Sequence, residues 1–186
     1  IDFVGNSPAL FEELMDYFIH GSSSVSQTTS WALGCIGEQN PTLIAFYHTI
    51  LLTHLQDNTK HNAVRRNIVR IYQTCPIPEE IEDELYEHCM SYILNPNEAI
   101  AIKAFSMTVC ERIAQKYTDL IPELIDAIAS VLPTGSAGVK NRGMHTITRL
   151  TKNKGKWCIS AQQDLPSNMY NFIKFQCSYV TMLSVK

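Results

Sequence analysis

The sequence predicts an all-α protein, a right-handed α-α superhelix of about four helix pairs followed by a C-terminal helix. Three observations indicate this class. Proline-led apolar segments recur along the chain, and a second set of apolar-periodic segments lies between them at intervals of 36–39 residues. Strand signals, such as alternating β-branched runs and hairpin turns, are poor throughout. With 186 residues and 45% hydrophobic content, the chain can bury one sizeable core.

The first set of segments begins with prolines, which a first helical turn tolerates because its N–H groups lack intrahelical acceptors. Ser7 and Asn40 stand directly before two of these prolines, and we expect both to cap their helices. We name these segments the A helices and expect them at residues 8–20, 41–56, 78–94 and 122–132.

The second set, the B helices, is predicted from a recurring pattern of apolar or small residues. In each segment such residues stand at an anchor position and four, seven and eight positions later, which would place them on one buried helix face. Asn95 and Glu98 resemble a capping box before the third B helix. The anchors are Val25, Val64, Ile100 and Val139, in expected helices at 22–38, 60–74, 97–117 and 136–150. Since one helix pair cannot bury both of its faces, four pairs are expected to stack.

The pattern changes after Leu150, so we expect the helical stack to occupy residues 1–150. Residues 151–165 are polar, and a segment that begins at Pro166 resembles a fifth A helix. This helix either caps the stack or belongs to a longer solenoid.

Cysteine spacing and hydropathy narrow the class further. No two of the six cysteines lie within four residues of each other, so no zinc or redox motif is present, and no cofactor is expected. Cysteines on apolar segments are typical of buried thiols in a cytoplasmic protein. No apolar run of eighteen residues predicts a membrane span.

The net charge of −3 conceals a separation of charge between the two helix sets. The A segments carry eleven acidic residues and no Lys or Arg. The B segments carry ten basic residues and only three acidic ones, Glu38, Glu98 and Glu111. Residues 151–186 add five lysines and one aspartate. A basic surface of this kind could attract an acidic protein or a nucleic-acid backbone. The alternative is that these charged side chains only keep exposed helix faces hydrated and interact favourably with the helix dipoles.

The first-turn prolines, Trp31–Gly34 (WALG) and the VRRNIV segment that begins at Val64 resemble the HEAT repeats of the armadillo-like α-superhelix. The resemblance covers residues 1–150 and implies that the A helices form a convex layer and the B helices line a concave, basic face. On the B helices we expect the positions three, six and ten residues after each anchor to point away from the buried stripe.

Residues 61–71, 75–85 and 132–143 are similar to small bacterial HEAT-like proteins, several of which carry the label adenylosuccinate lyase. Gly135-Ser136-Ala137 followed by Lys140 partly matches the serine loop of true lyases, but the Met, the Pro, the second Ser and the Lys spacing of that loop are absent. We therefore expect a turn in which Ser136 caps the fourth B helix.

No catalytic constellation, P-loop or dinucleotide fingerprint occurs, and we expect no catalytic and no metal-binding residue. The leading hypothesis is a non-catalytic protein-interaction scaffold whose partner is acidic. A nucleic-acid binder similar to HEAT-like DNA alkylation-repair proteins is the second hypothesis, and a purine-metabolism protein is the third. Trp31 is either an exposed anchor or part of the core, and His145 is either a binding residue or a surface histidine. The candidate partner-binding residues are Trp31, Arg66, Arg70, Lys103, Arg142, His145 and Arg149.

Overall fold

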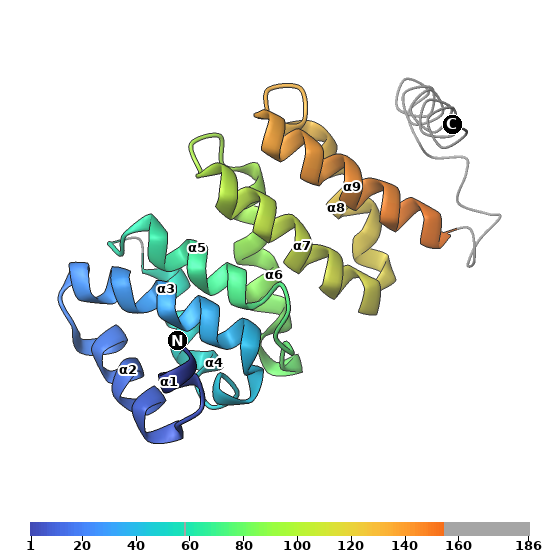
Figure 1. The fold of residues 1–186 in the computed structure, drawn as a ribbon. Coiled ribbons are helices and arrows are strands. Elements are labelled where there is room, and N and C mark those ends of the chain that lie inside the picture. The colour runs from blue at the N-terminus through green and yellow to red at the C-terminus, as the bar shows by residue number, and fades with distance from the viewer. Residues whose placement is uncertain (58, 155–186) are drawn as a thin grey trace, which may run out of the picture. The chain divides into compact units, whose positions relative to one another are not determined.

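A computed structural model describes residues 1–57 and 59–154 of the protein. By internal contacts the chain divides into two units, Ile1–Leu150 and Thr151–Lys186, and the fold described here is that of the first. All the regular elements among the described residues are helices (Figure 1), which confirms the all-α prediction. The predicted helix that begins at Pro166 lies outside the described residues.

The helices alternate between two layers. The A layer contains α2 (Pro8–His20), α4 (His48–Gln56), α6 (Glu79–Leu94) and α8 (Ile121–Val131). The B layer contains α3 (Ser23–Gln39), α5 (Asn62–Ile71), α7 (Ile100–Lys116) and α9 (Ala137–Lys154). The described residues also form three short helices, α1 (Asp2–Gly5), η1 (Pro41–Leu43) and η2 (Thr118–Leu120). The sequence pattern predicts neither α1 nor η2, whereas η1 lies within the A helix expected at 41–56.

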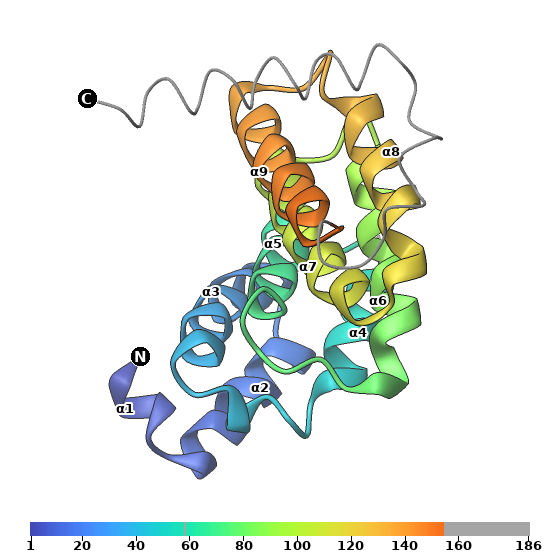
Figure 2. The same ribbon diagram turned by 90° about the vertical axis from the view of Figure 1, so that its right-hand side faces the viewer.

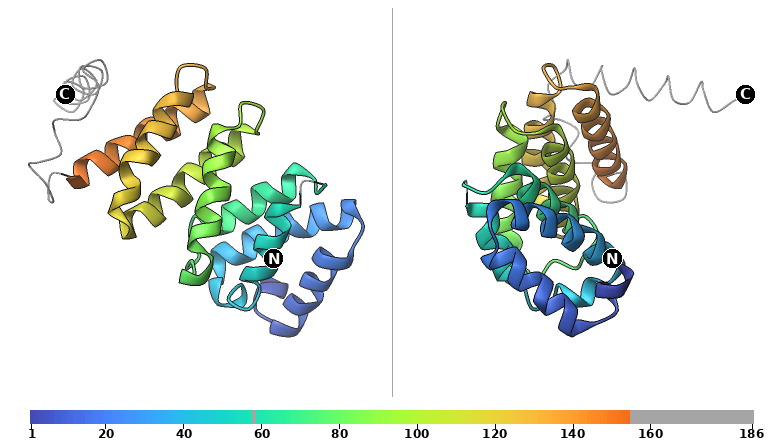
Figure 3. Two further views of the ribbon diagram at one scale, coloured as in Figure 1. Left: turned by 180° about the vertical axis from the view of Figure 1, so that it is seen from behind. Right: turned by 60° about the vertical axis from the view of Figure 1, so that its left-hand side comes forward.

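Successive pairs stack so that each layer buries the other. Helices α2 and α3, α4 and α5, and α6 and α7 pack within their pairs, while α3, α5 and α7 pack side by side along the B layer. Figure 2 shows the two layers, and Figure 3 shows the pairs following one another from the first to the last. The predicted stack of helix pairs is therefore confirmed.

Two predicted N-caps are present. The Ser7 hydroxyl accepts a hydrogen bond from the backbone N–H of Leu10 at 3.5 Å, directly before Pro8 at the start of α2. The Ser136 hydroxyl accepts a hydrogen bond from the backbone N–H of Val139 at 3.5 Å, and α9 begins at Ala137, directly after Ser136. Both hydroxyls satisfy N–H groups that a helix start leaves without partners.

The second A helix differs from its prediction, because it is broken. A 3-10 turn at Pro41–Leu43 is separated from α4 by residues 44–47. Within that break Ile44 is fully buried, and Tyr47 packs edge-on against Phe11 with ring centroids 5.7 Å apart. Asn40 is not a side-chain cap, because its amide nitrogen donates to the carbonyl of Gly5 at 3.1 Å. Tertiary packing of these side chains overrides the local helix signal.

The predicted capping box before α7 is wrong. The helix begins at Ile100 with Ala99 as its N-cap residue and no side-chain cap. Glu98 is instead buried and accepts a hydrogen bond from the guanidinium of Arg65 at 3.3 Å. The carboxylate that matched the capping pattern therefore joins α5 to the segment directly before α7.

The predicted buried stripe is correct for α5 and α9, since all four predicted positions of each pattern are buried. Val64, Ile68 and Ile71 are buried, but Val25 and Ile100, the anchors in α3 and α7, are 38% and 53% exposed. Helix α7 lies between two B-layer neighbours and packs against α6 and α8 as well, so most of its circumference is covered. The buried residues of α7 therefore extend well beyond the predicted stripe.

Two glycines mark close approaches between helices. A Cβ on Gly37 of α3 would lie 3.2 Å from Ile71 and 3.3 Å from Ile44. A Cβ on Gly143 of α9 would lie 2.8 Å from both Ile128 and Leu132. The absence of a side chain at these positions lets the helices approach closely.

Candidate partner-binding surface

The side of the B layer that is turned away from the A layer can be located on α7. Its half-exposed residues Ala101, Ala104, Phe105, Thr108 and Arg112 recur at helical spacing and so form one stripe. Helices α5, α6, α8 and α9 contact the other sides of α7. The stripe is therefore the part of α7 that faces away from the A layer.

We call this surface the B face. Each B helix contributes exposed or half-exposed residues at the same helical spacing. Besides the α7 stripe, the B face contains Trp31, Cys35 and Glu38 of α3, Arg66 and Arg70 of α5, and Arg142, His145 and Arg149 of α9.

An ion pair joins the first two B helices. The guanidinium of Arg70 donates two hydrogen bonds to the carboxylate of Glu38, at 2.8 Å from Nε and 2.6 Å from Nη2. These bonds, together with the nearby negative charge, raise the pKa of Arg70. Arg70 is one of the predicted partner-binding residues, and in the structure its guanidinium also holds neighbouring repeats together.

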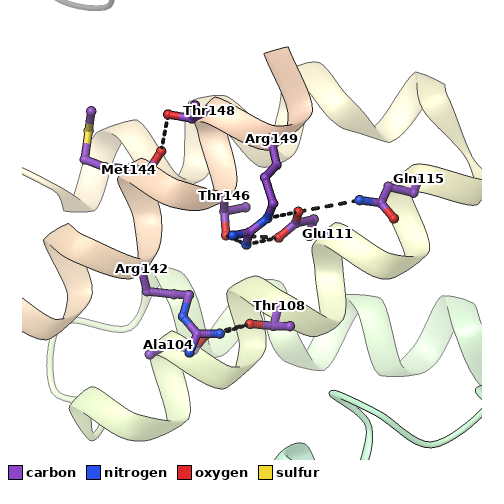
Figure 4. A network of polar contacts seen from close by, with 9 residues as sticks. All are labelled: Ala104, Thr108, Glu111, Gln115, Arg142, Met144, Thr146, Thr148 and Arg149. Atoms are coloured by element: carbon purple, nitrogen blue, oxygen red, sulfur yellow. Dashed lines mark hydrogen bonds and ion pairs between the residues drawn. The ribbon is translucent and has the colours of Figure 1, made fainter. Parts of the chain in front are cut away.

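A second network joins the last two B helices (Figure 4). The guanidinium of Arg149 donates two hydrogen bonds of 2.5 Å to the carboxylate of Glu111, which is almost fully buried. The Thr146 hydroxyl donates to the same carboxylate at 3.2 Å. Arg142 donates to the hydroxyl of Thr108 on α7. Arg142 and Arg149, both predicted for partner binding, therefore contact α7.

The middle of the B layer is joined in the same way. Arg65 pairs with Glu98 across 33 residues of sequence, and Asn67 donates to the Ser30 hydroxyl at 3.0 Å. The guanidinium of Arg112 donates to the carbonyls of Tyr72 and Cys75 at the end of α5, at 2.5 and 2.8 Å. Burial lowers the pKa of Arg112.

Two predictions about this surface differ from the structure. Lys103, a predicted partner-binding residue, is only 8% exposed, because it lies on the same side of α7 as Cys110, whose thiol contacts the Tyr86 carbonyl of α6. Asn67, Ser106 and Cys110 were also expected to face away from the buried stripe, and all three are buried. Positions three and six after the anchor are turned inward on α7, where Ala101, Ala104 and Phe105 form the outer stripe instead.

Three of the candidates are free on the B face. Trp31 is 51% exposed, and Arg66 and His145 are exposed. Among the described residues none of the three side chains forms a hydrogen bond or an ion pair. Of the two alternatives for Trp31, its exposed position excludes burial in the core and leaves a role as an anchor as a prediction.

Sequence reasoning did not anticipate that the B-layer carboxylates bind arginines. Glu38, Glu98 and Glu111 are each bound by an arginine of a neighbouring B helix. The rarity of these acids in the sequence could have indicated the pairing, because an isolated carboxylate among many basic residues is a candidate partner for one of them.

A family model described as HEAT repeat domain matches residues 1–150, which span all four helix pairs. The chain belongs to the HEAT repeat family. The comparison with curated proteins and the comparison with solved structures both found no match.

Outside the B face, the HEAT repeat domain carries its acidic residues mainly on the A layer. The acidic residues of α6 are exposed except for Glu82, which is buried and accepts hydrogen bonds from Lys116 at 2.9 Å and Tyr117 at 2.8 Å. Burial alone would raise the pKa of Glu82, but the two hydrogen bonds and the charge of Lys116 outweigh it and lower the pKa.

The described part of the HEAT repeat chain has no group of three or more His, Cys, Asp or Glu side chains placed to hold a metal ion. None of its helices is long and apolar enough to cross a membrane.

Proposed function

We propose that this HEAT repeat protein is a non-catalytic scaffold that binds an acidic protein partner through the B face. A stack of helix pairs presents an extended surface, which suits protein binding. The observation that carries the proposal is the pairing of all three B-layer carboxylates with arginines. Because those acids are neutralised, the unpaired charges that remain exposed on the B face, such as that of Arg66, are positive. An acidic partner would complement them.

The experiment compares capture of the native partner by two charge-reversal variants. The B-face variant carries Arg66→Glu, Arg142→Glu and His145→Glu, at B-face positions that form no ion pair in the described structure. The matched A-layer variant carries Glu80→Lys, Asp83→Lys and Glu87→Lys, at exposed positions of α6. We expect the B-face variant to lose the partner and the A-layer variant to retain it, with unchanged helical circular dichroism in both.

The opposite pattern, capture lost only in the A-layer variant, would overturn the proposal. The same proteins are mixed with duplex DNA at low and high salt, because phosphate contacts weaken steeply as salt rises. Salt-sensitive DNA binding that the B-face variant loses, without capture of a protein, would replace the proposal with the nucleic-acid hypothesis.

The purine-metabolism hypothesis has a weaker basis in the structure. Ser136, the residue that resembles a lyase serine, caps α9 through its hydroxyl. A cytoplasmic location accompanies our proposal, since Cys75, Cys89 and Cys110 are buried free thiols.

A further inference from the structure

Trp31 and Arg66 lie at corresponding positions along two neighbouring helices, α3 and α5. Helices α3 and α5 run parallel, because Ser30 bonds to Asn67 and, one turn later, Cys35 Sγ lies 3.9 Å from a guanidinium nitrogen of Arg70. Trp31 is one turn before Cys35, and Arg66 is one turn before Arg70. The two exposed side chains are therefore neighbours across the α3–α5 interface.

The chemistry of this pair is complementary to a specific kind of ligand. Arg66 offers a planar guanidinium without a carboxylate partner in the described structure, and Glu38, the acid of the adjacent helix, is already held by Arg70. Trp31 offers a large, half-exposed ring beside it. Arginine and tryptophan are the residue types that most often anchor protein interfaces.

The surface next to this pair on α7 is apolar and uncharged. Ala101, Ala104 and Phe105 are half-exposed there, and Lys103 is turned inward. A nucleic-acid backbone carries a charge about every 1.7 Å of duplex axis and needs a row of cations. A single unpaired arginine between an indole ring and apolar side chains instead fits a protein segment with one carboxylate between apolar residues.

We propose that Trp31 and Arg66 form a recognition site for an acidic protein segment, in which an Asp or Glu side chain pairs with Arg66 and a neighbouring Leu-like side chain packs on Trp31. This inference rests on the proposed function and specifies the chemistry that its partner must present. The carboxylate would form a bidentate pair with the guanidinium, and the apolar side chain would remove water from the indole ring.

The fluorescence of Trp31 provides a direct test in the full chain. The protein has two tryptophans, so Trp157→Phe leaves Trp31 as the single one. The probe is an acetylated peptide of sequence Glu-Glu-Leu-Glu-Glu-Leu-Glu-Glu, with Glu→Gln and Leu→Gly versions as controls. We expect a saturable blue shift of Trp31 emission with the probe, and a weaker response with either control peptide. Arg66→Gln should weaken binding about fivefold, whereas the exposed-residue control Lys140→Gln should leave it unchanged.

An unshifted Trp31 emission at saturating peptide, or equal binding by the Glu→Gln peptide, would overturn the inference. Capture of the native partner separates this failure from failure of the proposed function. If Trp31→Ala with Arg66→Gln retains the partner while the triple B-face variant loses it, the recognition site is wrong and the scaffold stands. If the triple variant also retains the partner, both are wrong.

Discussion

Glu111 illustrates how a buried charge is accommodated in the B layer. Its carboxylate is 4% exposed and accepts hydrogen bonds from Arg149, Thr146 and Gln115. A buried carboxylate without such partners would be strongly disfavoured. The bonds from α9 to this α7 residue raise the pKa of Arg149 and connect the last two repeats.

Replacing Glu111 with Gln should therefore destabilise the domain. The amide cannot accept both guanidinium bonds, but the side chain of Arg149 is half-exposed and can turn to water. We expect a loss of about 1–2 kcal/mol, measured by urea unfolding. Glu87→Gln, at an exposed position of α6, is the control and should change little. Equal midpoints for the two variants would show that the pair adds no stability.

His54 makes stability depend on pH near neutrality. Its ring stacks on Phe18 with centroids 4.6 Å apart, and its Nδ1 donates to the carbonyl of Ile50 at 2.9 Å. Burial lowers its pKa below the usual 6.5 and Lys60 lowers it further, while the bond to Ile50 and the charge of Asp57 oppose this shift. Neutral His54 thus contributes stability that is present above pH 6.5 and is lost as pH falls through the lowered pKa.

His54→Phe should reduce this pH dependence. The unfolding midpoint of the wild-type protein is expected to decrease from pH 7 to pH 5, and the variant should show a smaller decrease because Phe cannot be protonated. Burial also lowers the pKa of His48, so part of the decrease should remain. The surface variant His145→Gln should behave as wild type. A variant slope equal to that of the wild type would contradict this assignment.

At the scale of the helices, the close packing of α9 on α8 depends on Gly143. A side chain there would meet Ile128 and Leu132 at 2.8 Å. We expect Gly143→Val to destabilise the domain by about 1–3 kcal/mol through overpacking. Asn141→Val, on the exposed side of the same helix, is the matched control and should shift the thermal midpoint little. Similar thermal midpoints for both would mean that the helices can separate at no cost.

How far the sequence predicts each element depends on how local its determinants are. The start of α2 was predictable because Ser7 and Pro8 act within one turn. The break before α4 was not, because it depends on Tyr47 packing against Phe11, a residue distant in sequence.

The same distinction applies to the candidate surface. The positive charge of the B helices and the presence of Trp31 on α3 follow from the sequence. The engagement of Arg70 and Arg149 does not, because their carboxylate partners lie 32 and 38 residues away. Those partners become apparent only when the repeats stack.

At the scale of the whole domain, one arrangement gives both cohesion between repeats and a surface with free positive charge. Carboxylates on the B helices pair with arginines of the adjacent repeats and so join the repeats. The pairing leaves the remaining exposed charges of the B helices positive, beside the exposed ring of Trp31. The proposed scaffold function rests on this difference between the arginines that pair with carboxylates and the exposed cations that remain unpaired.

Hydroxyl-radical footprinting of the domain with and without its captured partner tests this claim most directly. Trp31 on the B face and Tyr17 on the A layer are both 51% exposed, so they report matched positions on opposite layers. We predict that the partner decreases the oxidation rate of Trp31 severalfold and leaves that of Tyr17 unchanged. Protection of Tyr17 with an unchanged rate at Trp31 would place the partner on the A layer and contradict the account.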